Sequence, residues 1–151
     1  MKNKNLSIFH LGPGNVGKAF LQLLTRNKPM LERIYGINIR VTGIFNSKFG
    51  LYKKEGIAPD RVEKIATGLE FTRGGVSSSN IISLIRHNPK PSILIDTTSS
   101  PVSFDILLTA LKSGSFVVLS NKRPLTATFP EFDKLNSFGQ SRIFYETTVG
   151  A

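Results

Sequence analysis

The sequence contains no cysteine among its 151 residues. This absence excludes disulfide bonds, thiolate metal ligands and cysteine nucleophiles, so any redox chemistry must come from a bound cofactor. Long apolar runs are also missing, since none approaches the roughly 18 residues that span a membrane. The start, MKNKNLSIFHLGPG, has an apolar stretch too short and too rich in glycine for a signal peptide. We therefore expect a cytoplasmic protein without a membrane partner.

Acidic residues are scarce: ten Asp and Glu stand against twenty Lys and Arg, which gives a formal net charge of +10. This charge favours polyanions or phosphorylated small molecules as ligands. The basic residues are scattered, however, and lack the interleaved aromatic residues of proteins that bind single-stranded nucleic acids. The sequence argues against nucleic acid as a partner. A solvated basic surface is the simpler alternative.

The length and the content of 40% hydrophobic and 20% charged residues fit one globular domain with its own core. Strand-like and helix-like apolar patterns alternate along it. We expect an α/β fold, a Rossmann-type doubly wound parallel sheet with helices on both faces. Residues 46–77 should form a loop with a short helix near 59–67. The predicted strands are 6–11, 37–45, 92–96, 115–120 and 142–148, and the other predicted helices are 15–26, 78–87, 101–114 and 129–139.

The stretch HLGPGNVGKAF carries glycines in the spacing GxGxxG between a predicted strand and a predicted helix. Gly12 permits a tight turn, Gly14 lets a pyrophosphate approach the main chain, and Gly17 lets the helix lie close to the strand. The helix N-terminus adds unpaired N–H groups and a partial positive charge. The pattern predicts a dinucleotide site. The alternative is a strand-to-helix turn in which the glycines serve geometry alone.

The end of the second predicted strand should carry the residue that reads the adenosine ribose, an acid where the 2′-hydroxyl is free. Here Asn46, Ser47 and Lys48 follow that strand. Lys48 can neutralise a 2′-phosphate and Ser47 can donate a hydrogen bond to it. The sequence thus predicts NADP(H) in preference to NAD(H), with NAD(H) as the second choice. An incidental lysine in a polar loop is the alternative.

Two further polar segments follow the strands 92–96 and 115–120, at the edge of a parallel sheet where ligands bind. In IDTTSSP, Thr98 and Ser99 can bond the nicotinamide half of the cofactor. In SNKRPLT, Lys122 is a cation that can polarise a carbonyl or bind a carboxylate. Taken alone, Lys122 would be read as a surface lysine.

The segments LGPGNVG, FNSK, IDTTSS, SNKRPL and YETTVGA occur in this order, and together they resemble the amino-terminal half of homoserine dehydrogenase over nearly the whole chain. The resemblance implies NAD(P)-dependent interconversion of homoserine and aspartate 4-semialdehyde, on the route to threonine and methionine. It implies that Asn15 and Val16 join the glycines in binding pyrophosphate. It also implies that Thr98 and Ser99 approach the nicotinamide ribose and that Lys122 is catalytic.

The same resemblance implies a monovalent cation held by the main-chain carbonyls of Glu146, Val149 and Ala151. Members of the family continue into a substrate and dimerisation domain. Residues 1–151 are therefore expected to be the dinucleotide-binding domain of a longer, homodimeric enzyme and to be inactive alone. Two alternatives stay open: another two-domain NADP-dependent dehydrogenase, and a non-catalytic Rossmann domain that senses a nucleotide.

Overall fold

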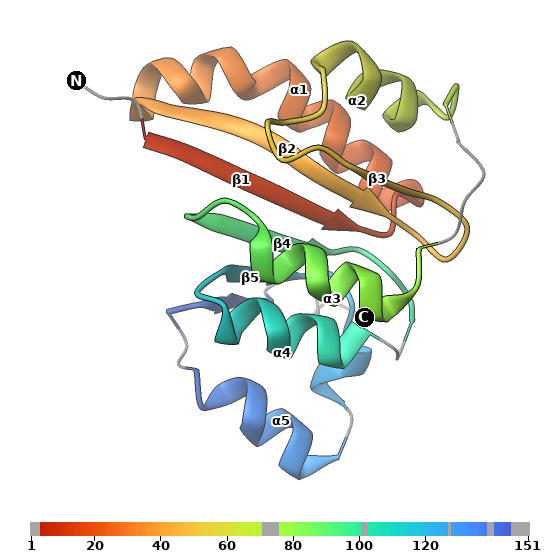
Figure 1. Cartoon of the computed structure of the whole chain (residues 1–151), viewed down its shortest axis with the longest axis vertical. Coiled ribbons are helices and arrows are strands. Elements are labelled where there is room, and N and C mark those ends of the chain that lie inside the picture. The colour runs from red at the N-terminus through yellow and green to blue at the C-terminus, as the bar shows by residue number, and fades with distance from the viewer. Residues whose placement is uncertain (1–3, 71–75, 101–102, 127, 139–140, 146–151) are drawn as a thin grey trace.

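The fold is one sheet of six strands, in the order β3-β2-β1-β4-β5-β6, with helices on both faces (Figure 1). The structure is a computed structural model, and it describes residues 4–70, 76–100, 103–126, 128–138 and 141–145. The strands are β1 (Lys4–Leu11), β2 (Ile37–Phe45), β3 (Gly50–Tyr52), β4 (Ser92–Asp96), β5 (Phe116–Leu119) and β6 (Ile143–Phe144). The helices are α1 (Asn15–Tyr35), α2 (Pro59–Thr67), α3 (Ser78–His87), α4 (Phe104–Lys112), η2 (Arg123–Leu125) and α5 (Phe129–Asn136).

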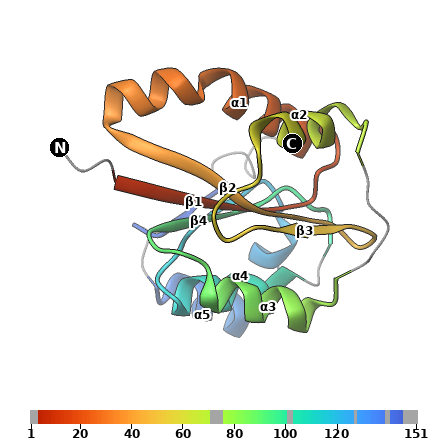
Figure 2. The ribbon, with the colours of Figure 1, turned by 45° about the horizontal axis from the view of Figure 1, so that its top comes forward.

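The helices divide between the two faces of the sheet: α1 and α2 lie on one, and α3, α4 and α5 on the other (Figure 2). Each face has its own apolar cluster, around Leu21 and Ile44 on the first and around Leu94 and Leu107 on the second. β1 lies between them, and its residues 7–11 are all buried. The predicted α/β class and the doubly wound arrangement are confirmed.

One strand departs from the parallel sheet that the sequence predicted. β3 pairs antiparallel with β2, whereas the other neighbouring strands pair in parallel. The sequence analysis assigned residues 50–52 to a loop, because three residues are too few to show a period. Their pairing depends on β2 beside them, with Phe45 opposite Gly50. The helix expected at 59–67 is present as α2.

α1 is longer than predicted, since it runs to Tyr35 and the prediction ended at residue 26. Pro29 lies inside it and cannot supply a backbone N–H. The second half is held by tertiary contacts: Leu31 packs against the core under α1, and Glu32 accepts a hydrogen bond from the Ile39 N–H at 2.9 Å. The helix ends at Gly36, whose φ of 62° is left-handed.

The other boundaries differ by a few residues from the predictions. The helix predicted at 101–114 is observed as α4 over 104–112, with residues 101 and 102 outside the described part. α5 ends three residues earlier than predicted, at Asn136 rather than 139. β6 covers only residues 143 and 144 of the predicted 142–148, of which 146–148 lie outside the described part.

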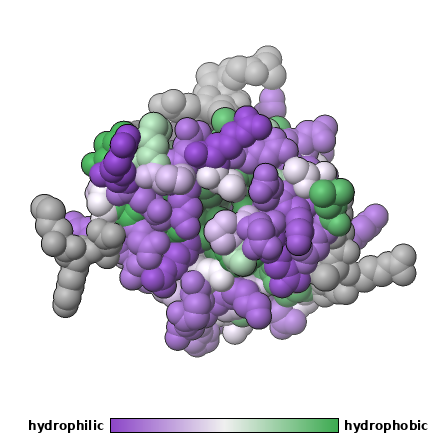
Figure 3. All heavy atoms as spheres, turned by 90° about the horizontal axis from the view of Figure 1, so that it is seen from above, coloured by the Kyte–Doolittle hydropathy of each residue, from purple (hydrophilic) through white to green (hydrophobic). Residues whose placement is uncertain are grey.

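The surface at the α1–α2 end of the molecule is dominated by hydrophilic residues, with apolar ones in small separate groups (Figure 3). Among the described helices, none is long and apolar enough to cross a membrane.

Candidate functional site

A hollow of about 380 Å³ lies where β1, β2 and β4 end at the carboxyl edge of the sheet. This is the edge at which open α/β sheets bind their ligands. The structure brings together there seven of the residues that the sequence predicted, from three separate segments. They are Gly12, Gly14, Asn46, Ser47, Lys48, Thr98 and Ser99, and Pro13, Thr97 and Ser100 complete the lining.

Gly12 and Gly17 allow the main chain to pass very close to its neighbours. Gly12 has a φ of 84°, and a Cβ there would lie 2.7 Å from the Thr98 nitrogen. A Cβ at Gly17 would lie 2.3 Å from the Gly12 carbonyl oxygen and 2.7 Å from the Thr97 hydroxyl. A Cβ atom does not come this close to a non-bonded neighbour, so only glycine lets α1 begin directly against the ends of β1 and β4.

Gly14 differs from these two glycines, because a Cβ there would meet nothing within 4 Å. Its backbone is not left-handed either, with φ at −79°. The folded chain alone therefore does not explain a glycine at this position. It is the N-cap of α1 and offers no side chain to the helix, whose first turn has no acid. The space beside Gly14 and the unpaired N–H groups of that turn suit a phosphate.

A four-residue turn joins β2 to β3 and forms another wall of the hollow. The Lys48 N–H donates to Asn46 Oδ1 at 2.8 Å, and the Asn46 N–H donates to the Phe49 carbonyl at 2.9 Å. Phe49 is buried and anchors the turn. Ser47 and Lys48 are exposed at the hollow as a result, and no carboxylate lines it.

The segment after β4 is built on Asp96, a fully buried carboxylate that the sequence analysis missed. Its Oδ1 accepts from the N–H of Thr98 at 2.8 Å and from the Thr98 hydroxyl at 2.7 Å. Its Oδ2 accepts from Asn121 Nδ2 at 3.2 Å. The hydroxyl proton of Thr98 is thus donated within the protein, and Thr98 helps to shape the segment after β4. Ser99, in contrast, is exposed.

Asn121 links the segment after β5 to the segment after β4. Its Nδ2 also donates to the Ser100 carbonyl at 2.8 Å, and its Oδ1 accepts from the Arg123 N–H at 3.1 Å. Asn121 and Asp96 lie 25 positions apart. The only signal for them in the sequence was their place within the polar segments IDTTSSP and SNKRPLT.

His10, at the end of β1, is a third buried polar residue that the sequence did not reveal, after Asp96 and Asn121. Its Nε2 lies 2.9 Å from the Thr97 hydroxyl, and burial lowers the pKa of His10 to about 4. The Thr97 hydroxyl in turn donates to the Gly12 carbonyl at 2.6 Å. The two side chains therefore lie directly behind the glycine loop.

Lys122 is exposed at the N-cap of η2, directly after β5, and does not line the hollow. Among the described residues it forms no ion pair. Asn15 and Val16 are exposed in the first turn of α1. The predicted cation ligands Glu146, Val149 and Ala151 lie outside the described residues. In the described ranges, no group of three His, Cys, Asp or Glu residues could hold a metal ion.

An apolar cavity of about 250 Å³ adjoins the hollow and shares Asn46, Ser47, Thr98 and Ser100 with it. Its apolar wall consists of Leu11, Phe45, Val76, Ile81 and Ile106. A cavity of this kind suits a flat, weakly polar ring such as a nucleobase.

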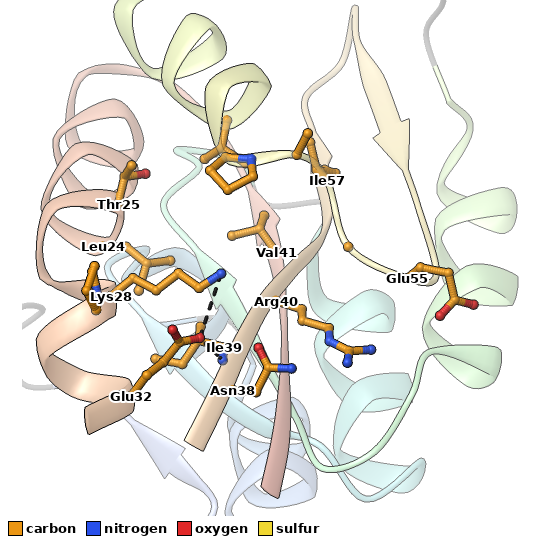
Figure 4. Close-up of a pocket in the computed structure, with 15 residues that line it drawn as sticks. Leu24, Thr25, Lys28, Glu32, Asn38, Ile39, Arg40, Val41, Glu55 and Ile57 are labelled. Carbon is orange, nitrogen blue, oxygen red and sulfur yellow. Dashed lines mark hydrogen bonds and ion pairs between the residues drawn. The ribbon is translucent and has the colours of Figure 1, made fainter. Parts of the chain in front are cut away.

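A larger hollow of about 510 Å³ lies elsewhere, between α1, β2 and the start of α2 (Figure 4). It contains none of the predicted site residues. Two of its charged side chains form an ion pair, since Lys28 Nζ of α1 lies 3.7 Å from Glu32 Oε1 one turn later (Figure 4). Glu32 is also bound to the β2 backbone. We therefore place the candidate site at the carboxyl edge.

The family model for the NAD-binding domain of homoserine dehydrogenase matches residues 12–146, which is most of the chain. The chain belongs to this family. The resemblance predicted from the motifs is confirmed.

Relatives agree with this assignment. A homoserine dehydrogenase of Pyrococcus horikoshii is 28% identical over 97% of the chain and 44% of its own length. A bifunctional aspartokinase/homoserine dehydrogenase of Haemophilus influenzae is 28% identical over 98% of the chain and 18% of its own length. The chain thus spans less than half of these homoserine dehydrogenase relatives.

Solved structures of homoserine dehydrogenases share the fold. A putative homoserine dehydrogenase of Archaeoglobus fulgidus has a TM-score of 0.70 and 25% identity, over 97% of this chain and 43% of that one. A hyperthermophilic archaeal homoserine dehydrogenase in complex with NADPH has a TM-score of 0.68 and 27% identity, over 97% of this chain and 44% of that one.

Proposed function

We propose that this chain is the cofactor-binding part of a homoserine dehydrogenase, which interconverts homoserine and aspartate 4-semialdehyde, and that it holds NADP(H). The observation that carries the proposal is the open space beside Gly14 at the N-terminus of α1. Neither packing nor backbone conformation requires glycine there, and this supports a ligand that approaches the main chain. The family assignment and the name of the NADPH-bound relative support the same cofactor.

NADP(H) is preferred over NAD(H) in this proposal because of the turn after β2. Lys48 and Ser47 are exposed at the hollow, and an acid that would repel a 2′-phosphate is absent from its lining. The Asn46 side chain holds the Lys48 backbone in place, so the cation is presented by an ordered turn. The neighbouring apolar cavity would take the adenine ring.

The nicotinamide supplies the hydride chemistry, and the protein binds, orients and moves protons. The Gly14 loop and the first turn of α1 hold the pyrophosphate. The segment 97–100, braced by Asp96 and Asn121, orients the nicotinamide half, with Ser99 as its exposed hydroxyl. Lys122 polarises the carbonyl oxygen of aspartate 4-semialdehyde or, in the reverse direction, accepts the hydroxyl proton of homoserine.

Further parts of the proposal concern the intact enzyme. Residues 1–151 act as the dinucleotide-binding domain of a cytoplasmic homodimer whose substrate domain completes the active site. A monovalent cation binds main-chain carbonyls at Glu146, Val149 and Ala151. The substrate is a small molecule.

Gly14→Val tests the proposal directly. The side chain enters open space, so the variant should fold like the wild type and lose NADPH binding at least a hundredfold, because the methyl groups occupy the place of the pyrophosphate. Calorimetric titration with NADPH measures the affinity, and circular dichroism controls the fold. Unchanged affinity in a folded Gly14→Val protein would refute the site.

A further inference from the structure

His10 occupies an unusual position for a histidine. Its side chain is fully buried, and its Nδ1 has no hydrogen-bond partner among the described residues. An unpaired buried nitrogen has an energetic cost that an apolar side chain of similar size would avoid. The other ring nitrogen, Nε2, contacts the Thr97 hydroxyl behind the glycine loop, and this contact is what an apolar side chain could not make.

The hydrogen atoms of this group can be assigned from the distances. The Thr97 hydroxyl lies 2.6 Å from the Gly12 carbonyl oxygen, and two oxygens so close require a proton between them. A carbonyl carries none, and the Leu11 carbonyl, 3.1 Å from the same hydroxyl, is the more distant acceptor. The single hydroxyl proton of Thr97 is therefore directed at Gly12. His10 Nε2, 2.9 Å from the same hydroxyl, must therefore be the donor. The ring is the neutral Nε2–H tautomer.

The chain of hydrogen bonds continues into the loop itself. The Gly12 carbonyl also accepts from the Gly14 N–H at 2.7 Å. Two donors thus fix this carbonyl, one from Thr97 and one from the residue beside the open space. The centroids of the His10 ring and the Phe20 ring of α1 lie 5.6 Å apart. A Cβ added at Gly17 would lie 2.6 Å from His10 Cε1.

We propose that His10 is a positioning residue of the cofactor site: through Thr97 it fixes the Gly12 carbonyl, and thereby the glycine loop, in the geometry that receives the pyrophosphate. The inference rests on the proposed function, because it concerns the same loop. His10 does not contact the cofactor. Its action passes through the hydroxyl of Thr97, which joins the ends of β1 and β4.

The experiment compares two ligands and two pairs of variants. NADPH engages the loop through its pyrophosphate, whereas adenosine 2′-monophosphate, which lacks the 5′-phosphates, reaches only the adenosine end. His10→Leu and Thr97→Val remove the hydrogen bonds. His10→Gln keeps a nitrogen donor at about the same distance from the main chain as His10 Nε2, and Thr97→Ser keeps the hydroxyl. Calorimetric titration gives the dissociation constants.

We expect His10→Leu and Thr97→Val to weaken NADPH binding about five- to tenfold, which corresponds to the loss of one ordinary hydrogen bond. The dissociation constant of adenosine 2′-monophosphate should stay within twofold of the wild-type value. His10→Gln and Thr97→Ser should recover most of the loss. The double variant His10→Leu/Thr97→Val should lose no more than Thr97→Val alone, because both act through one hydroxyl.

Three results would overturn the inference. NADPH affinity could stay unchanged in the folded variants, both ligands could weaken equally, or ¹⁵N spectra of the wild type could show a protonated Nδ1 and an unprotonated Nε2. Should His10→Leu fail to fold, the Thr97→Val and Thr97→Ser pair decides the question. A wild-type protein that does not bind NADPH at all would instead refute the proposed function, a result the same titration distinguishes.

Discussion

Lys48 illustrates how a single residue on the turn after β2 can select the cofactor. A lysine contact to a 2′-phosphate that is partly exposed to water should give roughly a five- to thirtyfold preference for NADPH. Lys48→Ala should therefore weaken NADPH binding by this factor and leave the affinity for NADH unchanged. Lys48→Glu should weaken NADPH further, because it replaces attraction by repulsion. Titrations with both cofactors measure the ratio.

A matched control for Lys48→Glu is Lys54→Glu. Lys54 is also exposed and lies after β3, and it does not line the hollow. Lys54→Glu alters the net charge by the same amount as Lys48→Glu. It therefore separates the effect of a local contact with the 2′-phosphate from the effect of the overall electrostatic field. Equal NADPH-to-NADH ratios in the wild type, Lys48→Ala and Lys48→Glu would show that Lys48 does not read the phosphate.

His10 should make the stability of the fold depend on pH. Its pKa is about 4 in the folded protein and near 6.5 when unfolded, so the unfolded chain binds the proton first as the pH falls. The free energy of unfolding should then decrease below pH 6.5, by about 2 kcal/mol between pH 7.5 and pH 5. Urea unfolding at these pH values tests this. In His10→Leu, this part of the pH dependence should vanish; an unaltered dependence would contradict the assignment.

At the scale of elements, the contact between α1 and β1 depends on Gly17. Ala is the better helix former by about 1 kcal/mol, so an unconstrained Gly17→Ala would stabilise α1. Its Cβ, however, would lie 2.3 Å from a backbone oxygen that belongs to the glycine turn. The steric effect should dominate, and we expect a loss of roughly 2–4 kcal/mol in denaturant unfolding. Gly14→Ala is the control, expected near wild type. A stable Gly17→Ala would mean that α1 can move off the sheet.

At the level of the whole molecule, the proposed cofactor site and Lys122 belong to different segments of the carboxyl edge. In the full-length enzyme, Lys122→Ala should leave the NADPH dissociation constant within twofold and lower turnover roughly 10²- to 10³-fold, as loss of a proton-transferring or charge-stabilising group does. Steady-state kinetics and titration on the same protein separate the two effects. Intact turnover would favour a nucleotide-sensing domain over an enzyme.

The local features of this protein could be predicted from its sequence. Strands 37–45 and 92–96 and helix 78–87 were predicted at their observed bounds. The period of the apolar residues and the turn residues that indicate these bounds lie within or directly beside each segment. The glycine loop could also be predicted, since Gly12, Gly14 and Gly17 lie within one strand–turn–helix unit, and the close backbone approach at Gly12 and Gly17 is observed. The family followed from the motifs taken together, above all from SNKRPL followed by YETTVGA, and the family model confirms it.

Features that depend on residues far away in the chain could not be predicted in this way. β3 exists because β2 offers it an edge, and α1 continues past Pro29 because the core and Ile39 hold its second half. The pairs His10–Thr97 and Asp96–Asn121 join residues 87 and 25 positions apart, and no local pattern marks a polar side chain that is buried among distant partners. Sequence periodicity reports which face of an element is apolar, whereas the hydrogen bonds that shape this site form only once the ends of β1, β4 and β5 meet at one edge.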